Sequence, residues 1–202
     1  MQSTLLLEPG HYYHIYNRGN NRENIFIEER NYQHFLRLYV KYLEPVTETF
    51  AYCLMPNHFH LLVRVKTERP DLDNPANLTP LTTSDVMQQF ANFFNAYAKA
   101  INKAYGRTGA LFQKKFGRRL VTTDRYFTTL VHYIHQNPQK HGFVAHFREW
   151  PHSSYNALLG DQPTRLQRGQ VLTWFGGAEA LRQMHTALAD ETAISTLIEE
   201  DQ

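Results

Sequence analysis

Two kinds of hydrophobic periodicity alternate along the first 140 residues, and their order restricts the fold more than any other feature of the chain. Segments with β-branched and aromatic residues at alternate positions predict strands, whereas apolar residues three and four apart predict helices. The resulting order is strand, helix, strand, strand, helix, strand, helix. The expected strands lie at 12–16, 50–54, 58–65 and 119–122, and the expected helices at 28–43, 84–105 and 124–137.

Local signals define the ends of these segments. Ser84 or Asp85 is expected to cap the long second helix, and Asp124 the third. Pro138 is expected to end the third helix near Asn137, because proline lacks the N–H that a helix needs. Each predicted helix is therefore bounded by residues that favour its start or its end.

Two strand-helix-strand sets in succession predict a ferredoxin-like α+β fold with an antiparallel sheet. In such a fold the helices cover one face, and the other face is left open to carry a site. Residues 66–82 contain three prolines and are expected to form a loop. The fold hosts many unrelated chemistries, so it does not identify the function.

Composition excludes several classes of protein. The single cysteine, Cys53, rules out an internal disulfide framework and a four-cysteine zinc site, and is expected to fill the core. No apolar run approaches the roughly 20 residues that span a membrane. The N-terminus has neither the basic start nor the long apolar stretch of a signal peptide. A cytoplasmic protein without a membrane partner is expected.

The charge is distributed unevenly along the chain. Residues 161–202 hold three basic and seven acidic side chains; the whole chain is +2 and this segment is −4, which leaves +6 for residues 1–160. We therefore expect a main domain at 1–160, an acidic and mainly helical accessory tail at 161–202, and a polyanionic ligand for the main domain.

A His-Phe-His sequence at positions 58 to 60 is the sharpest local signal. Residues two apart on a strand point to the same side, so His58 and His60 would share a face about 7 Å apart and could bind one metal ion. Phe59 would point to the opposite face and pack under the helices. The alternative is that two of the eleven histidines alternate by chance.

Tyr133 and Asn137 are four residues apart on the third predicted helix, so they share a face. A nucleophile and a metal ligand could be presented together, because an amide oxygen is a hard donor that suits Mg²⁺ or Mn²⁺. Alternatively, Tyr133 is a core aromatic residue, and Asn137 ends the helix before proline.

Basic residues are concentrated between positions 103 and 125, with Asp124 as the one acid. This density suits phosphate binding, with Phe112 and Phe116 available to stack on unpaired bases, although solvated lysines beside a strand are equally compatible. The polar segment 17–22 offers further donors, or is only a hairpin tip. The basic residues are Lys103, Arg107, Lys114, Lys115, Arg118, Arg119 and Arg125.

Together and in this order, these motifs resemble the REP-associated tyrosine transposases, a branch of the single-tyrosine transposases within the His-hydrophobic-His endonuclease superfamily. The resemblance covers residues 11 to about 160. The segments that carry it are YHIYNRGNNR at 13–22, YCLMPNHFHLLV at 52–63, LFQ at 111–113, YIHQNP at 133–138, and Trp150 with SSY at 153–155.

The resemblance implies a DNA transposase that cleaves and rejoins single-stranded DNA. His58 and His60 would hold a divalent ion, Mg²⁺ or Mn²⁺, with Asn137 as third ligand where relatives have Gln or Asn. Tyr133 would be the nucleophile, and a phenol with an ordinary pKa near 10 needs a nearby cation to favour phenolate. The product would be a 5′-phosphotyrosine and a free 3′-hydroxyl, and a second 3′-hydroxyl could then rejoin the strands without a nucleotide cofactor.

In that family the DNA folds as a hairpin and bases near its foot guide cleavage. The resemblance therefore implies single-stranded or hairpin DNA as partner and a nucleoid location when bound. The residues expected to contact DNA are Arg18, Asn20, Asn21, Arg22, Lys114, Lys115, Arg118 and Arg119.

Two other functions remain open at this stage. One is a domesticated sequence-specific DNA-binding protein that has lost transposition activity. The other is a phosphoesterase or RNA nuclease with His58 and His60 as acid and base, which is disfavoured because both would point the same way. The tail could cover the basic surface, make a homodimer or contact the DNA end.

Overall fold

The structure is a computed structural model that describes residues 5–71, 74, 76–113 and 115–186. A four-stranded antiparallel sheet has the order β2-β3-β1-β6. The elements of the main domain are β1 (Tyr12–Arg18), η1 (Asn20–Arg22), α1 (Glu29–Tyr42), β2 (Thr47–Met55), β3 (His58–Val65), β4 (Glu68–Pro70), β5 (Leu78–Pro80), α2 (Thr83–Ala104), β6 (Gly117–Val121), α3 (Asp124–Lys140), η2 (Phe147–Glu149) and α4 (Tyr155–Leu159).

This strand order confirms the predicted α+β class with its antiparallel sheet. β1 lies between β3 and β6, so the strand that begins the chain is central, and the sequence order β1-α1-β2-β3-α2-β6 is the split β-α-β arrangement. Seven register pairs join β1 to β3, from Tyr12 opposite Arg64 to Arg18 opposite His58. The two strands that carry the candidate site are therefore neighbours along their full length.

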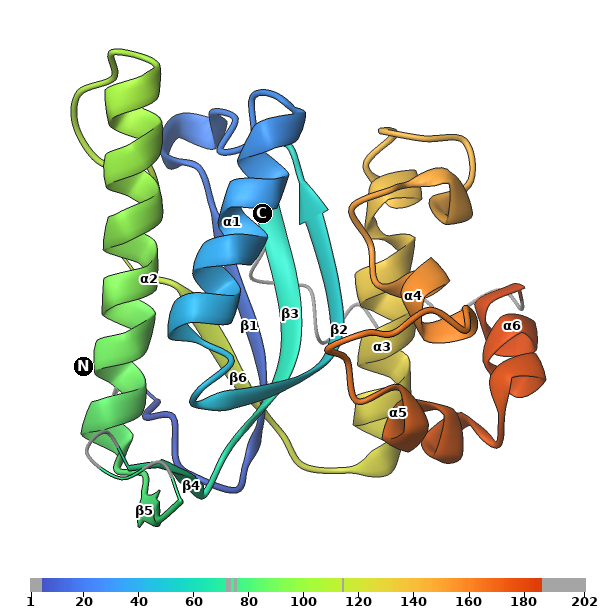
Figure 1. Cartoon of the computed structure of the whole chain (residues 1–202). Helices are drawn as coiled ribbons and strands as arrows, with labels where there is room; N and C mark the ends of the chain where they lie inside the picture. The colour runs from blue at the N-terminus through green and yellow to red at the C-terminus, as the bar shows by residue number, and fades with distance from the viewer. Residues whose placement is uncertain (1–4, 72–73, 75, 114, 187–202) are drawn as a thin grey trace.

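One face of the sheet packs against α1 and α2, which lie side by side in Figure 1. Ile15, Phe59, Leu61 and Val63 point to this face and are almost fully buried. The aromatic residues of α2 pack against α1. The rings of Phe93 and Phe35 of α1 are 4.8 Å apart between centroids. As predicted, Phe59, which lies between the two histidines of β3, belongs to the core under the helices.

The other face of the sheet is only partly open, because α3, the helix expected near this open face, packs on it. α3 packs across β2 and the near part of β3, and Figure 1 shows it on the side of the sheet away from α1 and α2. Leu62, Cys53 and Met55 are buried under it, together with Leu130 and Ile134 of the helix. The amphipathic pattern of α3 indicates that one side of the helix is buried. It does not indicate which part of the protein that side packs against.

Four boundaries differ from the expected ones. α3 is capped by Thr123 instead of Asp124, because the Thr123 hydroxyl accepts a hydrogen bond from the Tyr126 amide at 3.1 Å. α2 is capped by Thr82 instead of Ser84 or Asp85, and Asp85 completes a capping box as the third helical residue. α3 continues through Pro138 to Lys140, because proline removes only one hydrogen bond within the helix. Residues 66–82, expected as a loop, contain the short antiparallel pair β4 and β5.

The tail continues into the same structure as far as residue 186. It contains α5 (Arg168–Phe175) and α6 (Ala178–Thr186), and residues 187–202 of the predicted tail lie outside the described part of the chain. Trp174 of α5 packs against Phe127 of α3, with 3.7 Å between ring centroids, and against Phe50 of β2 at 5.4 Å. The described part of the tail thus helps to build the second core.

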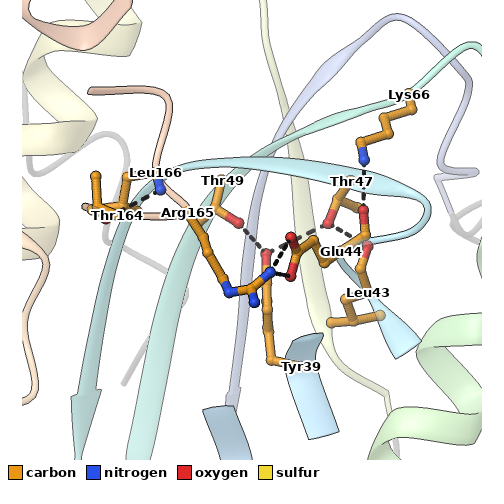
Figure 2. A network of polar contacts seen from close by, with 9 residues as sticks. All are labelled: Tyr39, Leu43, Glu44, Thr47, Thr49, Lys66, Thr164, Arg165 and Leu166. Atoms are coloured by element: carbon orange, nitrogen blue, oxygen red, sulfur yellow. Dashed lines mark hydrogen bonds and ion pairs between the residues drawn. The ribbon is translucent and has the colours of Figure 1, made fainter. Parts of the chain in front are cut away.

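The outer edge of β2 is covered by the start of the tail, as Figure 2 shows. Thr49 and Leu166 form a parallel bridge, and the Gln167 amide donates to the Thr49 carbonyl at 2.8 Å. Arg165 donates two hydrogen bonds to the Glu44 carboxylate. This edge strand is thereby protected from pairing with another chain.

Two further expectations concern composition. Cys53 is fully buried, as predicted for a core residue, and burial raises the pKa of its thiol. Among the helices of the described residues, none has the length and apolar character that crossing a membrane requires.

Candidate catalytic and metal site

The register of β1, β3 and β6 sorts their side chains onto two faces. Residues directly opposite each other on antiparallel strands point to the same side, and the side alternates along each strand. We call the face turned away from α1 and α2 the site face. Its residues on these three strands are Tyr12, His14, Tyr16 and Arg18 of β1, His58, His60, Leu62 and Arg64 of β3, and Gly117, Arg119 and Val121 of β6.

The two histidines of β3 lie together on the site face. Their ring centroids are 5.3 Å apart and their planes are nearly perpendicular, and the residues are only 6% and 2% exposed, respectively. The structure thus brings His58 and His60 together as the strand alternation predicted.

Helix α3 places its polar residues opposite the histidine pair. Tyr133, Asn137 and His141 follow one another at intervals of four and therefore share one face of the helix and its C-terminal end. The Tyr133 ring lies 5.3 Å from His60, and the His141 ring lies 4.8 Å from His58, both between centroids. Asn137 lies one helical turn from each of them and is fully buried.

Two buried polar atoms at this site have no hydrogen-bond partner within the described residues: Nε2 of His58 and Oδ1 of Asn137. The other polar atom of each side chain is engaged. His58 Nδ1 lies 2.6 Å from Asn57 Oδ1, and Asn137 Nδ2 donates to the Tyr133 carbonyl at 2.8 Å. Leaving such groups unsatisfied costs free energy, so their persistence at one site favours a bound partner.

An imidazole nitrogen and an amide oxygen are donors that suit a divalent cation, so this set fits the predicted ion. Within the described residues, no three or more His, Cys, Asp and Glu side chains are grouped so that they could hold a metal. The candidate set has only two residues of those types, and its third donor is an amide. Asn137 is therefore the residue on which the completeness of the site depends.

Burial keeps the imidazoles of the site neutral. It lowers the pKa of His58 to about 3, with smaller contributions from the charges of His141 and Arg18. Burial likewise holds the pKa of His60 well below its ordinary value, and lowers that of His14 to about 3 with help from Arg119. A neutral imidazole retains the lone pair that a metal requires, so no proton has to be displaced before binding.

Sequence reasoning missed His14 and Asn57. His14 Nε2 lies 2.9 Å from His60 Nδ1, and the two rings stack with centroids 5.1 Å apart. The alternation of Tyr12, His14 and Tyr16 along β1 was a usable signal, but it became specific only once the pairing of β1 with β3 was known. Asn57 lies in the tight turn that precedes His58. From the sequence alone Asn57 is explained as a turn-forming residue, so nothing marks it as part of the site.

The polar segment that follows β1 lies beside the histidine pair. Arg18 is directly opposite His58, and the Gly19 amide donates to the Asn57 carbonyl at 2.8 Å. Asn20, Asn21 and Arg22 are exposed in η1. Asn21 and Arg22 have φ angles of 54° and 60°, a conformation that is uncommon for residues other than glycine. The predicted DNA-contacting residues of this segment thus border the candidate site.

The basic residues of the second segment are more dispersed. Arg119 lies on the site face opposite His14, whereas Arg118 points to the other face, where it donates to the Met87 sulfur and covers the Phe116 ring. Lys115 is exposed. Lys114 lies outside the described residues.

Phe112 and Phe116, which could stack on bases, pack against the aromatic residues of α2 in this structure. Phe112 is 8% exposed and packs edge-on against Phe94, and Phe116 stacks on Phe90 with centroids 5.3 Å apart. Phe112 is thus part of the core around α2, whereas Phe116 is half-buried beside it.

Comparisons with known proteins agree with the predicted resemblance. No protein-family model matches the chain. A curated protein of Haemophilus influenzae that is named for the REP-associated tyrosine transposases is 29% identical over 109 residues. The match spans 54% of this chain and 59% of the relative, so it covers less than two thirds of the relative's length.

A solved structure of a REP-associated tyrosine transposase bound to a REP hairpin is similar in fold. It superimposes with a TM-score of 0.55 at 18% sequence identity, covering 81% of this chain and 88% of that chain. The sequence comparison confirms the resemblance that the motifs predicted, and the structural comparison confirms the fold.

Proposed function

We propose that the chain is a metal-dependent transposase that cleaves and rejoins hairpin-forming single-stranded DNA through a tyrosine-linked intermediate. The relative and the structural neighbour described above are named as transposases, and the neighbour is bound to a hairpin. The observation that carries the proposal is the meeting of Tyr133 with the histidine pair across two separate elements. Its ring lies 5.3 Å from His60, on the same helical face as the unpartnered Asn137 oxygen.

In this proposal the protein positions the ion and the nucleophile, and its polar groups are oriented before the DNA binds. His58, His60 and Asn137 would hold Mg²⁺ or Mn²⁺ through Nε2 of His58, a ring nitrogen of His60 and Oδ1 of Asn137. A divalent cation bound there neutralises charge on the non-bridging phosphate oxygens and favours the phenolate of a nearby tyrosine. Because the site is buried, competing water is limited and electrostatic effects are strong.

Tyr133 would act on the phosphodiester as a nucleophile. Its oxygen would form a new bond to phosphorus, the bond from phosphorus to the 3′-oxygen would break, and that oxygen would leave as a hydroxyl after taking up a proton. The DNA would then be joined to Tyr133 through a 5′-phosphate. Attack by another 3′-hydroxyl on the same phosphorus would release the tyrosine and rejoin the strand.

The DNA would enter beside the segment that follows β1. Arg18 borders His58, and the exposed side chains of Asn20, Asn21 and Arg22 offer donors to phosphates and base edges. Arg119 adds positive charge to the same face. These contacts would hold the foot of a hairpin while the adjacent single strand reaches Tyr133.

A covalent adduct tests this function. Incubation with a hairpin oligonucleotide and Mn²⁺ should give a protein-DNA species of lower mobility in a denaturing gel. Tyr133→Phe should abolish it, whereas Tyr126→Phe, a matched change on the same helix, should retain it. An adduct that persists in Tyr133→Phe would contradict the assignment. Tight hairpin binding without cleavage under any divalent ion would favour a domesticated DNA-binding protein.

A further inference from the structure

The two candidate metal ligands of β3 share a feature that the ion itself does not explain. Nδ1 of each ring is within hydrogen-bond distance of a neighbouring side chain: Asn57 Oδ1 for His58 at 2.6 Å, and His14 Nε2 for His60 at 2.9 Å. The remaining nitrogen of each ring, Nε2, is the one that could face an ion. The identity of the protonated nitrogen therefore decides whether each histidine can be a ligand.

A neutral imidazole carries one N–H and one lone pair. Asn57 Oδ1 can only accept, so the hydrogen bond at His58 requires the proton on Nδ1. This leaves the lone pair of His58 on Nε2, the buried nitrogen without a partner in the described structure. The turn residue thereby selects the tautomer in which His58 can bind a metal.

For His60 the hydrogen bond allows two directions. If His14 donates from Nε2, then Nδ1 of His60 is the acceptor and its own proton must sit on Nε2, which prevents binding there. If His60 donates from Nδ1, its Nε2 lone pair is available. His14 is 3% exposed and its ring lies 4.9 Å from that of Tyr16, so it is held in place by packing on the same face.

We propose that His14 and Asn57 are positioning residues that accept the Nδ1 protons of His60 and His58 and so direct Nε2 of both rings toward one divalent cation. The inference rests on the proposed function, because it assigns the ion to the site described above. Neither residue touches the ion or the DNA. Outer partners of this kind orient metal-binding histidines in many proteins, and their loss typically weakens metal binding by about 10- to 100-fold.

The tautomers can be measured without metal and without DNA. Long-range ¹H–¹⁵N spectra of the uniformly labelled full chain, at neutral pH with a chelator, distinguish protonated Nδ1 from protonated Nε2 in each ring. The expected result is Nδ1 protonation in both His58 and His60. Nε2 protonation of His60 would overturn the proposal. This measurement uses the unmodified protein, so it stays decisive even if a variant does not fold.

Matched variants then test the consequence for the ion. His14→Gln retains a polar acceptor near the position of Nε2, whereas His14→Phe keeps the flat ring without one. Asn57→Asp and Asn57→Leu form the corresponding pair. By electron paramagnetic resonance, Mn²⁺ affinity should fall about 10- to 100-fold in His14→Phe and Asn57→Leu and stay within a few-fold in the other two.

The positioning role and the proposed function are contradicted by different results. Wild-type Mn²⁺ affinity in His14→Phe, with the His60 tautomer unchanged, would overturn the positioning role. Absence of Mn²⁺ binding in the unmodified protein would contradict the proposed function, whatever the tautomers. Recovery of binding in His14→Gln but not in His14→Phe would separate a lost hydrogen bond from a general structural effect and support the proposal.

Discussion

At the scale of single residues, the candidate site is defined by groups that the fold leaves unsatisfied. The Asn137 oxygen is buried and has no hydrogen-bond partner in the described structure, and Asn137 lies one helical turn from Tyr133, whose ring is 5.3 Å from that of His60. A residue kept for packing alone would be apolar at such a position. A substitution can separate the proposed role of Asn137 in metal binding from its contribution to stability.

Asn137→Leu should weaken Mn²⁺ binding at least tenfold while changing the free energy of unfolding by no more than about 1 kcal/mol. The small effect on stability is expected because the change removes an unsatisfied oxygen together with one hydrogen bond. Asn102→Leu is the matched control, since Asn102 of α2 also has an unpartnered oxygen and one donated hydrogen bond. Equal Mn²⁺ affinity in both variants would contradict the ligand role.

Gly19 is required for steric reasons in the segment proposed to contact DNA. A Cβ atom there would lie 1.9 Å from the Glu23 carbonyl oxygen, and backbone cannot yield as a side chain does. Gly19→Ala should therefore lower the free energy of unfolding by about 1–3 kcal/mol and weaken hairpin binding. Urea unfolding and a filter-binding titration measure these two effects.

Gly169 of α5 provides the control, because a Cβ atom there has no neighbour within 4 Å. Gly169→Ala should leave DNA binding unchanged and raise stability slightly, by about 0.4–1 kcal/mol, through the less flexible unfolded chain. Equal stability of the two alanine variants would contradict the steric requirement for glycine at position 19.

Some of these residues could be predicted from the sequence more readily than others, because each required a different kind of information. Strand alternation alone placed His58 and His60 on one face. Tyr133 could be selected among twelve tyrosines only through the resemblance, because helical spacing does not separate a catalytic phenol from a core one. His14 could not be found without the pairing of β1 with β3, which is a contact between residues 46 positions apart.

At the scale of elements, α3 and the tail determine how the second face of the sheet is used. α3 carries Tyr133 and Asn137, and its other side is held against β2 by the aromatic cluster that includes Trp174 of α5. The helical character of the tail could be predicted from sequence. Its attachment along the β2 edge could not, because a parallel bridge between Thr49 and Leu166 leaves no periodic signal.

Trp174→Ala should lower the free energy of unfolding by about 3 kcal/mol, because it removes a large ring that packs against both Phe50 and Phe127. Met184→Ala, on the exposed side of α6, should change it by no more than about 0.5 kcal/mol. Chemical unfolding followed by circular dichroism compares them. A tail without a structural role would give two variants of equal stability.

At the scale of the whole molecule, the buried neutral histidines of the described residues include two separate groups. One is the site, and the other joins α3 to α6: His135 Nδ1 lies 2.8 Å from His185 Nε2, and His135 Nε2 lies 2.8 Å from the Ser154 hydroxyl. Burial lowers the pKa of His185 to about 3 and that of His135 well below its ordinary value. Both groups link the stability of the fold to pH.

The direction of this dependence follows from proton binding. Below about pH 6.5 the unfolded chain protonates these histidines and the folded protein does not, so stability present above pH 6.5 should fall as the pH drops toward 3. Each such histidine contributes about 1.4 kcal/mol per pH unit within that window. Urea unfolding at pH 7.5, 6 and 5 with a chelator measures the loss. Constant stability across this range would contradict buried neutral imidazoles.

We propose that Tyr133 of α3 and the two histidines of β3 act on the same phosphate. The most direct test of this proposal is mass spectrometry of peptides from the protein after reaction with a hairpin oligonucleotide and Mn²⁺. The expected product is a nucleotide joined through its 5′-phosphate to the peptide that contains Tyr133. Attachment at any other residue, or a cleaved oligonucleotide without covalently modified protein, would contradict it.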